Sequence, residues 1–476
     1  MKSDAGTVLG EESDHGEYEF AFDPVPDSKR KSGFSLFMVL AGYPIAVSNF
    51  VTGAAIGYRM PFVDALVAIL AADAFLIFIA ISTGIISFET GLSTSFLSRT
   101  VFGRKGSSIF SFLLVMSSIT WIGINGNTFA TMVTANFPEF PVPEAILGAA
   151  IILVWSISAM RGYKGLEIVS WIGVPAAVVM AIICFVMIGV RFGGYGVVFS
   201  YVPDPADAMT FTQASASIVG SWVFGCLITP DVCRFAKSKK GVVGAGSGAF
   251  LLGLFCLQFV GCVVAQVAHN GDFSAATASI GLGYLILACT LVCLCTTQDN
   301  NIYGAGLAMQ NILGETKLRG KVTHRQVALA VTVLAAAFAA CGALSYLLPI
   351  IQFLSVLMAP IPALIASERY LVRRSKAQIP VNPIALVAWL LGGAVGQLCL
   401  QFDFFVSPVV AFVFTAFAYA ALSKLLDERV LGSEFARLGS KGAGDGDVNS
   451  RAGGNDSAGL SDRSVDEADG CDSLAI

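Results

Sequence analysis

The chain alternates between long apolar stretches and short polar segments. A helix needs about 20 mostly apolar residues to cross a bilayer. Twelve stretches approach that length, and they run roughly over 34–58, 62–86, 108–135, 143–160, 166–190, 211–229, 242–268, 280–312, 325–342, 345–366, 382–400 and 405–426. The pattern predicts an all-α polytopic membrane protein whose twelve transmembrane helices form one domain, residues 33–426.

Both ends of the chain are polar. Residues 1–32 place acidic side chains ahead of the basic run Lys29-Arg-Lys31, which is the wrong order for a cleavable signal peptide. The C-terminal segment is rich in Gly, Ser and Asp from about Gly439 and cannot bury enough apolar surface to fold. We therefore expect disordered cytoplasmic tails over 1–32 and 427–476.

Composition excludes most soluble classes of protein. Hydrophobic residues make up 55% of the chain and charged residues 13%, with a mean hydropathy of +0.74. The eleven cysteines are scattered and the three histidines are unpaired, so neither a disulfide framework nor a metal centre is indicated. We expect no enzyme, no cofactor, no nucleic-acid partner and no obligate protein partner. The expected partners are the bilayer and a small molecule.

Basic residues give the orientation, because cytoplasmic loops carry an excess of Lys and Arg. With the N-terminus in the cytoplasm, only Arg59 and Arg191 of the 29 Lys and Arg residues fall outside. The tally predicts a multi-pass protein of the plasma (cell inner) membrane with both termini cytoplasmic.

The most polar stretch inside a span is Thr296–Asn301, six polar residues in a row. Polar groups within a bilayer are costly and usually face a binding site or pathway. The alternative is the polar end of a helix near the lipid headgroups. Apolar and small residues continue beyond the stretch, from Gly304 to Met309, and favour the binding site.

Two spans carry apparent interruptions, Gly42-Tyr-Pro44 in the first and Val219–Gly225 followed by Pro230 in the sixth. Glycine and proline free backbone groups that need partners inside the protein, although glycine also permits close helix packing. Interruptions five spans apart are typical of a five-plus-five inverted repeat, with substrate and ion at the unwound midpoints. The last two helices would then be additional.

The third span presents Trp121 and Asn125 on one helical face, with Ser118 close to them. A tryptophan in a span is more often a packing residue. Combined with Trp222 in the sixth span and the amides of the eighth, however, it favours a site for a planar heterocycle. Such a ring would stack on the indoles and bond the amides through its edges.

Several spaced motifs resemble the nucleobase:cation symporter-1 (purine–cytosine permease) family, and together they cover nearly all of 33–426. The motifs are Thr296-Thr-Gln-Asp-Asn300 with Tyr303-Gly-Ala-Gly306, Val219-Gly-Ser-Trp222 with Pro230–Phe235, Arg99–Gly106, Trp121 and Tyr370–Arg374. The resemblance implies a leucine-transporter-like fold that works by alternating access.

By the family pattern, Trp121 and Trp222 sandwich the ring, and Gln298 and Asn301 bond its edge. The full set of candidate substrate residues is Trp121, Asn125, Ser221, Trp222, Gln298, Asn301, Ser118 and Asn49. Bacterial cytosine permeases carry Phe in place of Trp222 and Gln in place of Ser118. These departures leave cytosine, a purine and another planar ring all open.

The family also implies a sodium site. Its ligands would be the carbonyls of Ala46, Asn49 and Cys293 with the hydroxyls of Thr296 and Thr297. The alternative is that these hydroxyls only bond back to the preceding helical turn.

Protons are the rival coupling ion, through the span carboxylates Asp73 and Asp299. Relatives carry a neutral Asn in place of Asp73, and a local helix contact is the favoured interpretation of that residue. Asp231 and Arg234, at the end of the sixth span, would form an inner gate or a surface ion pair. We favour the surface pair.

The resulting expectation is a secondary active importer of a nucleobase, cytosine or a purine, by Na⁺ symport. One alternative is a proton-coupled importer of hydantoin, allantoin or uracil. Another is a non-transporting nucleobase sensor of the same fold.

Overall fold

The computed structural model describes residues 24–161, 163–346, 357–372 and 379–430. Most of the two predicted tails, residues 347–356 of the predicted span 345–366 and the end of the motif Tyr370–Arg374 lie outside the described residues. Residues up to Leu425 form one compact unit, and the description below concerns that unit.

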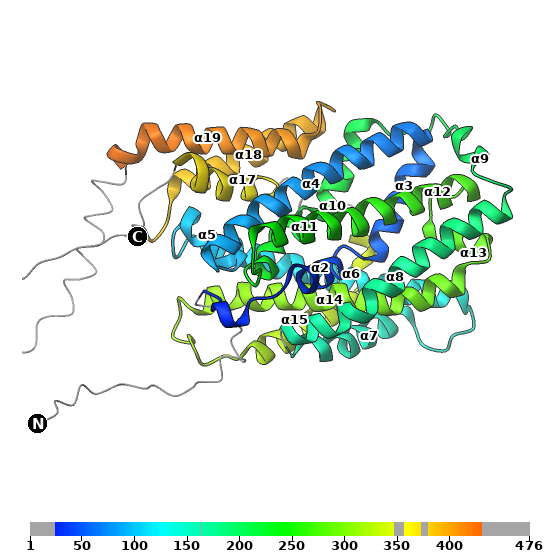
Figure 1. Cartoon of the computed structure of the whole chain (residues 1–476), viewed down its shortest axis with the longest axis horizontal. Coiled ribbons are helices and arrows are strands. Elements are labelled where there is room, and N and C mark those ends of the chain that lie inside the picture. The colour runs from blue at the N-terminus through cyan, green and yellow to red at the C-terminus, as the bar shows by residue number, and fades with distance from the viewer. Residues whose placement is uncertain (1–23, 162, 347–356, 373–378, 431–476) are drawn as a thin grey trace, which may run out of the picture. The chain divides into compact units, whose positions relative to one another are not determined.

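The regular secondary structure of the described residues is helical, with one isolated bridge between Lys31 and Ala236. In chain order (Figure 1) its main helices are α2 (Gly33–Ala41), α3 (Val47–Arg59), α4 (Phe62–Thr90), α5 (Thr94–Phe102), α6 (Ser107–Asn136), α7 (Glu144–Ala159), α8 (Tyr163–Arg191), α10 (Phe211–Cys233), α11 (Lys239–Phe250), α12 (Leu257–Ala268), α14 (Gly283–Leu313), α15 (His324–Ala340), α17 (Pro360–Ser367), α18 (Pro383–Gln401) and α19 (Ser407–Val430). Shorter elements are η1 (Asp27–Lys29), α9 (Gly196–Phe199), η2 (Leu251–Cys256), α13 (Phe273–Ser279), η3 (Ala343–Tyr346) and η4 (Glu368–Val372).

Eight helices of the described chain are long and apolar enough to cross a membrane: α4, α6, α8, α10, the rod from α11 through η2 to α12, α14, α18 and α19. The shorter apolar helices α7 and α15 accompany them. This agrees with a polytopic membrane protein. The described residues do not give twelve full-length spans, because the first predicted span is divided and part of the tenth, residues 347–356, lies outside them.

The predicted break in the first span is present. α2 ends at Ala41, and α3 begins at Val47. Asn49 holds the break, since its side-chain amide donates to the carbonyls of Pro44 (2.5 Å) and Gly253 (2.9 Å). The side chain of Asn49 therefore bonds one carbonyl in the break and one in η2, and so connects the first span to the seventh.

The predicted interruption of the sixth span is wrong, because α10 runs unbroken from Phe211 to Cys233. Gly225 in this helix instead permits close packing. A Cβ on Gly225 would lie 2.7 Å from the Trp222 ring and 2.8 Å from the Tyr43 ring. The carbonyl of Pro230, near the end of α10, accepts a hydrogen bond from Ser87 Oγ at 2.7 Å.

The seventh span contains an irregularity that the sequence did not reveal. A π-helical turn, η2, separates α11 from α12, and Pro44 packs against its Gly253. Beyond η2, a Cβ on Gly53 would lie 1.9 Å from the carbonyl oxygen of Gln258, so α3 and α12 approach backbone to backbone. The break in the first span thus packs against the π-helical turn of the seventh span.

The helices pack mainly in two sets. One set joins α2 and α3 with α4, α10, α11 and α12, while the other joins α6, α7, α14 and α15. α8 contacts members of both sets, and α3 touches α14 across the boundary. In Figure 1, α14 and α15 lie beside α7, and α10 and α11 lie beside α4.

Residues 24–32, which the sequence assigns to the N-terminal tail, are ordered against this unit. Val25 is buried, and the main-chain nitrogen of Lys31 donates to the carbonyl of Phe235 at 2.6 Å. Lys31 also pairs with Glu167 on α8 at 2.9 Å. The ordered region therefore begins earlier than residue 33.

Candidate substrate and ion site

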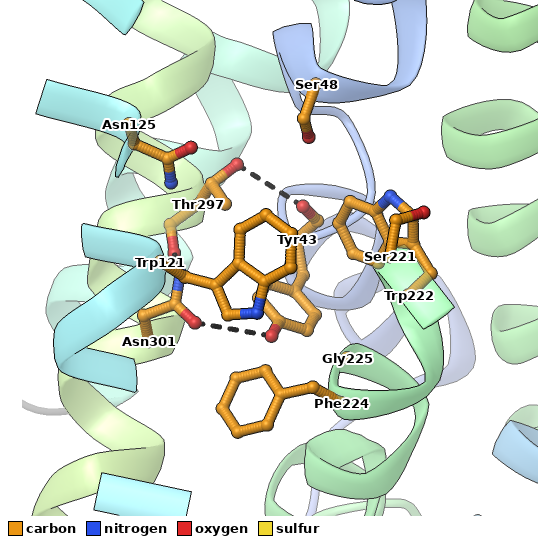
Figure 2. A pocket seen from close by; sticks show the side chains of 10 residues that line it. All are labelled: Tyr43, Ser48, Trp121, Asn125, Ser221, Trp222, Phe224, Gly225, Thr297 and Asn301. Carbon is orange, nitrogen blue, oxygen red and sulfur yellow. Dashed lines mark hydrogen bonds between the residues drawn. The ribbon is translucent and has the colours of Figure 1, made fainter. Parts of the chain in front are cut away.

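A small cavity lies where the break between α2 and α3 faces α6, α10 and α14 (Figure 2). Its lining residues are Tyr43, Ser48, Trp121, Asn125, Ser221, Trp222, Phe224, Gly225, Thr297 and Asn301. Its volume is about 20 Å³. Aromatic rings and side-chain amides from helices far apart in sequence therefore meet at one point.

Tyr43 links the walls of this cavity. Its hydroxyl donates to Asn301 Oδ1 at 3.3 Å, and its ring meets Trp222 edge to face, with centroids 5.4 Å apart. Its main-chain carbonyl accepts a hydrogen bond from Thr297 Oγ1 at 3.3 Å (Figure 2). The break in the first span is thereby tied to both α10 and α14.

Trp121 projects from α6 towards Tyr43, with Trp222 beyond it (Figure 2). Its indole nitrogen is buried and has no hydrogen-bond partner among the described residues. Buried donors in proteins are nearly always paired, so this nitrogen is free to bond a ligand.

A vestibule of about 710 Å³ adjoins the cavity. The two spaces share Ser48, Trp121, Asn125 and Ser221. The far wall of the vestibule includes Arg59 at the end of α3 and the segment from His269 to Ser274. The site is therefore approachable from the Arg59 end of the helices.

The opposite end of the unit is held by buried hydrogen bonds. Arg234 is fully buried and donates from Nη2 to the hydroxyl of Tyr303 on α14 at 2.9 Å. Asp231 is also buried, and its Oδ1 accepts from the main-chain nitrogen of Thr94 at 2.7 Å. The expectation of a surface ion pair between Asp231 and Arg234 is wrong, because both side chains lie inside the protein and join α10 to α5 and α14.

The comparisons with known proteins agree with this arrangement. Residues 24–421 match the family model described as permease for cytosine/purines, uracil, thiamine and allantoin. The chain belongs to this family. It is 27% identical over 420 residues to the cytosine permeases of Escherichia coli O157:H7 and of strain K12, which covers 86% of this chain and 95% of each relative. This permease-family protein is thus a membrane transporter and not an enzyme.

Solved structures share its fold. A closed conformation of Mhp1, a nucleobase-cation-symport-1 family transporter with bromovinylhydantoin bound, has a TM-score of 0.70 at 16% identity and covers 84% of this chain and 95% of that chain. The inward-facing conformation of Mhp1 has a TM-score of 0.69 at 17% identity, with coverage of 88% and 96%. A substrate-bound, outward-open Na⁺-coupled sialic acid symporter has a TM-score of 0.63 at 14% identity, with coverage of 87% and 93%.

In this permease, five of the eight candidate substrate residues line the cavity: Trp121, Asn125, Ser221, Trp222 and Asn301. Gln298 stands behind it, with its Nε2 donating to the Ile122 carbonyl at 3.2 Å and its Oε1 3.5 Å from Asn125 Nδ2. Its position suits orienting Asn125 rather than touching a ligand.

The other two candidates also lie outside the lining. The side-chain amide of Asn49 is bonded to the carbonyls of Pro44 and Gly253 at the helix break. Ser118 is buried, with an Oγ that has no partner in the described part of the chain. A substrate role for either therefore requires movement of the lining.

Both hydroxyls of the candidate sodium site bond back to the preceding helical turn, as the alternative interpretation predicts, and Thr297 also reaches the break in the first span. Thr296 Oγ1 donates to the Cys293 carbonyl at 2.7 Å, and Thr297 Oγ1 reaches both that carbonyl and the Tyr43 carbonyl at 3.3 Å. The carbonyl of Ala46 accepts from the main-chain nitrogen of Asn49 at 3.0 Å. Hydroxyls that rotate can turn oxygen lone pairs to a cation, so this donor set suits a hard monovalent ion.

The polar stretch Thr296–Asn301 is buried throughout. The interpretation of a helix end among lipid headgroups is therefore wrong, since the stretch lies within the helix packing. Within it, Asp299 turns away from the cavity, and its Oδ1 accepts from Ser158 Oγ on α7 at 2.8 Å.

The sequence interpretation missed four lining residues, Tyr43, Ser48, Phe224 and Gly225. Tyr43 stands inside the Gly42-Tyr-Pro44 break, which is a usable signal, because an aromatic residue at an unwound point faces the space that the break creates. Nothing in the local sequence distinguishes Ser48 or Phe224 from packing residues.

Proposed function

We propose that this permease imports a nucleobase, cytosine or a purine, together with Na⁺ by alternating access. The observation that carries the proposal is the cavity at the helix break, where two indoles and a phenol surround a small space edged by the amides of Asn125 and Asn301. Stacking of a base on an aromatic ring contributes about 1–3 kcal/mol. Amides select among ring edges through their paired donors and acceptors.

The cavity must expand to admit a ring. A space of about 20 Å³ holds little more than one water molecule. Trp121 lines both the cavity and the vestibule, so rotation of its indole would join the two spaces. We take the open vestibule, with the buried contacts of Arg234 at the other end, as support for an outward-facing state.

Sodium would act between the helix sets. Ligation by Thr296 and Thr297 on α14 and by carbonyls of the α2–α3 break would draw the two together beside the ring site. A membrane potential of 100 mV supplies about 2.3 kcal/mol per charge. A tenfold sodium gradient adds about 1.4 kcal/mol. Together the potential and the gradient support accumulation of the substrate inside the cell by a few hundredfold.

The proposal includes twelve spans, a five-plus-five inverted repeat, two additional C-terminal helices, and both termini on the cytoplasmic side of the plasma membrane. The helix packing supports the repeat. Counted in order, spans 1, 2, 6 and 7 form one set and spans 3, 4, 8 and 9 the other, so each set contains complete repeat pairs.

Two alternative functions differ from this proposal, one in the coupling ion and substrate, the other in that no transport occurs. One is a proton-coupled importer of hydantoin, allantoin or uracil, and the other is a nucleobase sensor that binds without transport. The vestibule, which gives access to the ring site, favours transport of some planar ring over a closed binding module.

The test is uptake of radiolabelled cytosine by cells that lack their own permeases, with Na⁺ replaced by choline in a parallel arm. Unlabelled adenine, hypoxanthine, uracil, hydantoin and allantoin serve as competitors. Na⁺-dependent uptake blocked by a nucleobase is the expected result. Binding without uptake would support the sensor. If only hydantoin or allantoin competes, the substrate is a ring of that kind and not a nucleobase.

A further inference from the structure

A second buried polar pair lies away from the substrate cavity, between α4 and α12. Asp73 on α4 is only 2% exposed, and Gln258 on α12 is fully buried. Gln258 Nε2 donates to Asp73 Oδ1 at 3.4 Å. The other two polar atoms of the pair, Asp73 Oδ2 and Gln258 Oε1, have no partner among the described residues. Two unpaired acceptors on two side chains already in contact are costly.

One proton would satisfy both atoms. A carboxylic acid and a primary amide form a cyclic pair, in which the amide N–H bonds one carboxyl oxygen and the acid O–H bonds the amide oxygen. The first of these bonds is present between Gln258 and Asp73. An ionised Asp73 would leave both acceptors without a donor, whereas a protonated Asp73 supplies one.

The surroundings favour this neutral form. Asp73 lies near enough to the thiols of Cys226 on α10 and Cys256 in η2 to interact with them electrostatically, and no hydrogen bond or ion pair joins it to a basic residue in the described chain. The other charged groups of α4 lie towards its two ends: Asp64 is exposed in the first turn, and Glu89 near the last turn pairs with Lys239 of α11 and Arg369 of η4. Glu89 is sixteen residues from Asp73, about 24 Å along the helix.

A proton suits the site better than a metal ion. Asp73 and Gln258 line neither the cavity nor the vestibule. A hard cation needs room and about six oxygen ligands, whereas a proton needs only one oxygen to bind and one to accept its hydrogen bond.

The pair is connected to the moving part of the substrate site. Gln258 Nε2 also lies 3.5 Å from Asn49 Oδ1, and the amide of Asn49 holds the carbonyls of Pro44 and Gly253. Loss of the proton from Asp73 would remove the second bond of the pair and loosen Gln258, whose amide contacts the Asn49 side chain at the helix break.

We propose that Asp73 and Gln258 form a proton-binding site whose occupancy is coupled to the helix break, so that one proton enters with the substrate. The proposal rests on the proposed symport function. The proton binds to Asp73 Oδ2 when the site faces the side of uptake. It leaves when rearrangement of the break opens the pair on the other side, and no bond other than O–H forms or breaks.

The experiment uses the full chain in proteoliposomes, with the membrane potential clamped at zero. The labelled substrate is whichever of cytosine and its five competitors is transported fastest. In one arm, Na⁺ is equal on both sides and the outside is one pH unit more acidic. In the other, pH is equal and Na⁺ is tenfold higher outside. One coupled proton gives up to tenfold accumulation in the first arm.

Asp73→Asn should reduce the accumulation ratio in the pH arm to about one while retaining Na⁺-driven uptake. Asp64→Asn, an exposed position on the same helix, is the matched control and should behave as wild type. In the double variant Asp73→Asn, Gln258→Glu, the amide lies on α4 and the acid on α12. This exchange variant keeps an acid–amide pair and should restore the response to pH.

Three results overturn the inference: a wild type that ignores the pH gradient, an Asp73→Asn variant that keeps the response, or an exchange variant that is driven by Na⁺ but not by pH. If neither gradient drives uptake of any ring by the wild type, the proposed symport function itself fails.

Discussion

The hydroxyl of Thr297 on α14 donates a hydrogen bond to the main-chain carbonyl of Tyr43, 3.3 Å away in the break between α2 and α3. This contact joins the two helix sets beside the aromatic cavity. An ion bound to the same oxygens would strengthen that connection, which is how we expect a cation gradient to act on the ring site.

Thr297→Val keeps the shape of the side chain and removes its oxygen. We expect the Na⁺ concentration for half-maximal uptake to rise about tenfold or more, since loss of one polar interaction of 1.4 kcal/mol is a factor of ten. Thr297→Ser restores the hydroxyl and should stay near wild type. An unchanged Na⁺ dependence in the valine variant would remove Thr297 from the ion site.

Trp222→Ala removes an indole that lines the cavity and packs against Tyr43. Loss of a stacking face of about 1–3 kcal/mol predicts substrate binding weaker by roughly 5- to 150-fold. Trp171→Ala, at a half-exposed position on α8, is the control and should bind normally. Equal affinities for the two variants, measured by radioligand binding, would argue against a ring site at Trp222.

Tyr303→Phe removes the acceptor for Arg234 at the end opposite the vestibule. A hydrogen bond to a charged group contributes about 1.5–3 kcal/mol, so this end should open more often. Hydrogen exchange over residues 94–102 and 228–236 is expected to accelerate. Tyr284→Phe, on the exposed face of the same helix, should leave exchange unchanged. Identical exchange in both variants would show that the contact does not close this end.

Gly53→Ala should destabilise the protein, because its Cβ would lie 1.9 Å from the carbonyl oxygen of Gln258 and force α3 away from α12. The comparison is Gly244→Ala on α11, where a Cβ meets no atom within 4 Å. Alanine is about 1 kcal/mol better than glycine in a helix interior, so this variant should be neutral or slightly more stable. Thermal unfolding in detergent measures both. A Gly53→Ala melting temperature at or above wild type would contradict the close approach.

The features that the sequence predicted well depend on the cost of polar groups in a bilayer. The burial of Thr296–Asn301 and the break at Gly42-Tyr-Pro44 both follow from local composition, because unpaired backbone and side-chain groups need partners inside the protein. Local rules alone also identified Trp121 and Asn125 as one face of a helix, and both line the cavity.

The errors arise where the deciding partner is distant in sequence. Gly225 reads equally well as a helix break or a close contact, and only the ring of Tyr43 packed against it decides the matter. Asp231 and Arg234 have the spacing of a surface pair, yet they are buried because Thr94 and Tyr303 supply their partners.

The most direct test of the central claim is the affinity of the purified protein for labelled cytosine, or for the competitor that proves to be its ring, with and without Na⁺. Binding at a shared helix break requires reciprocal coupling between ring and ion. Replacing choline by Na⁺ is expected to tighten binding of the ring at least tenfold, and Thr297→Val is expected to abolish this gain. An affinity that is the same in Na⁺ and choline would contradict it.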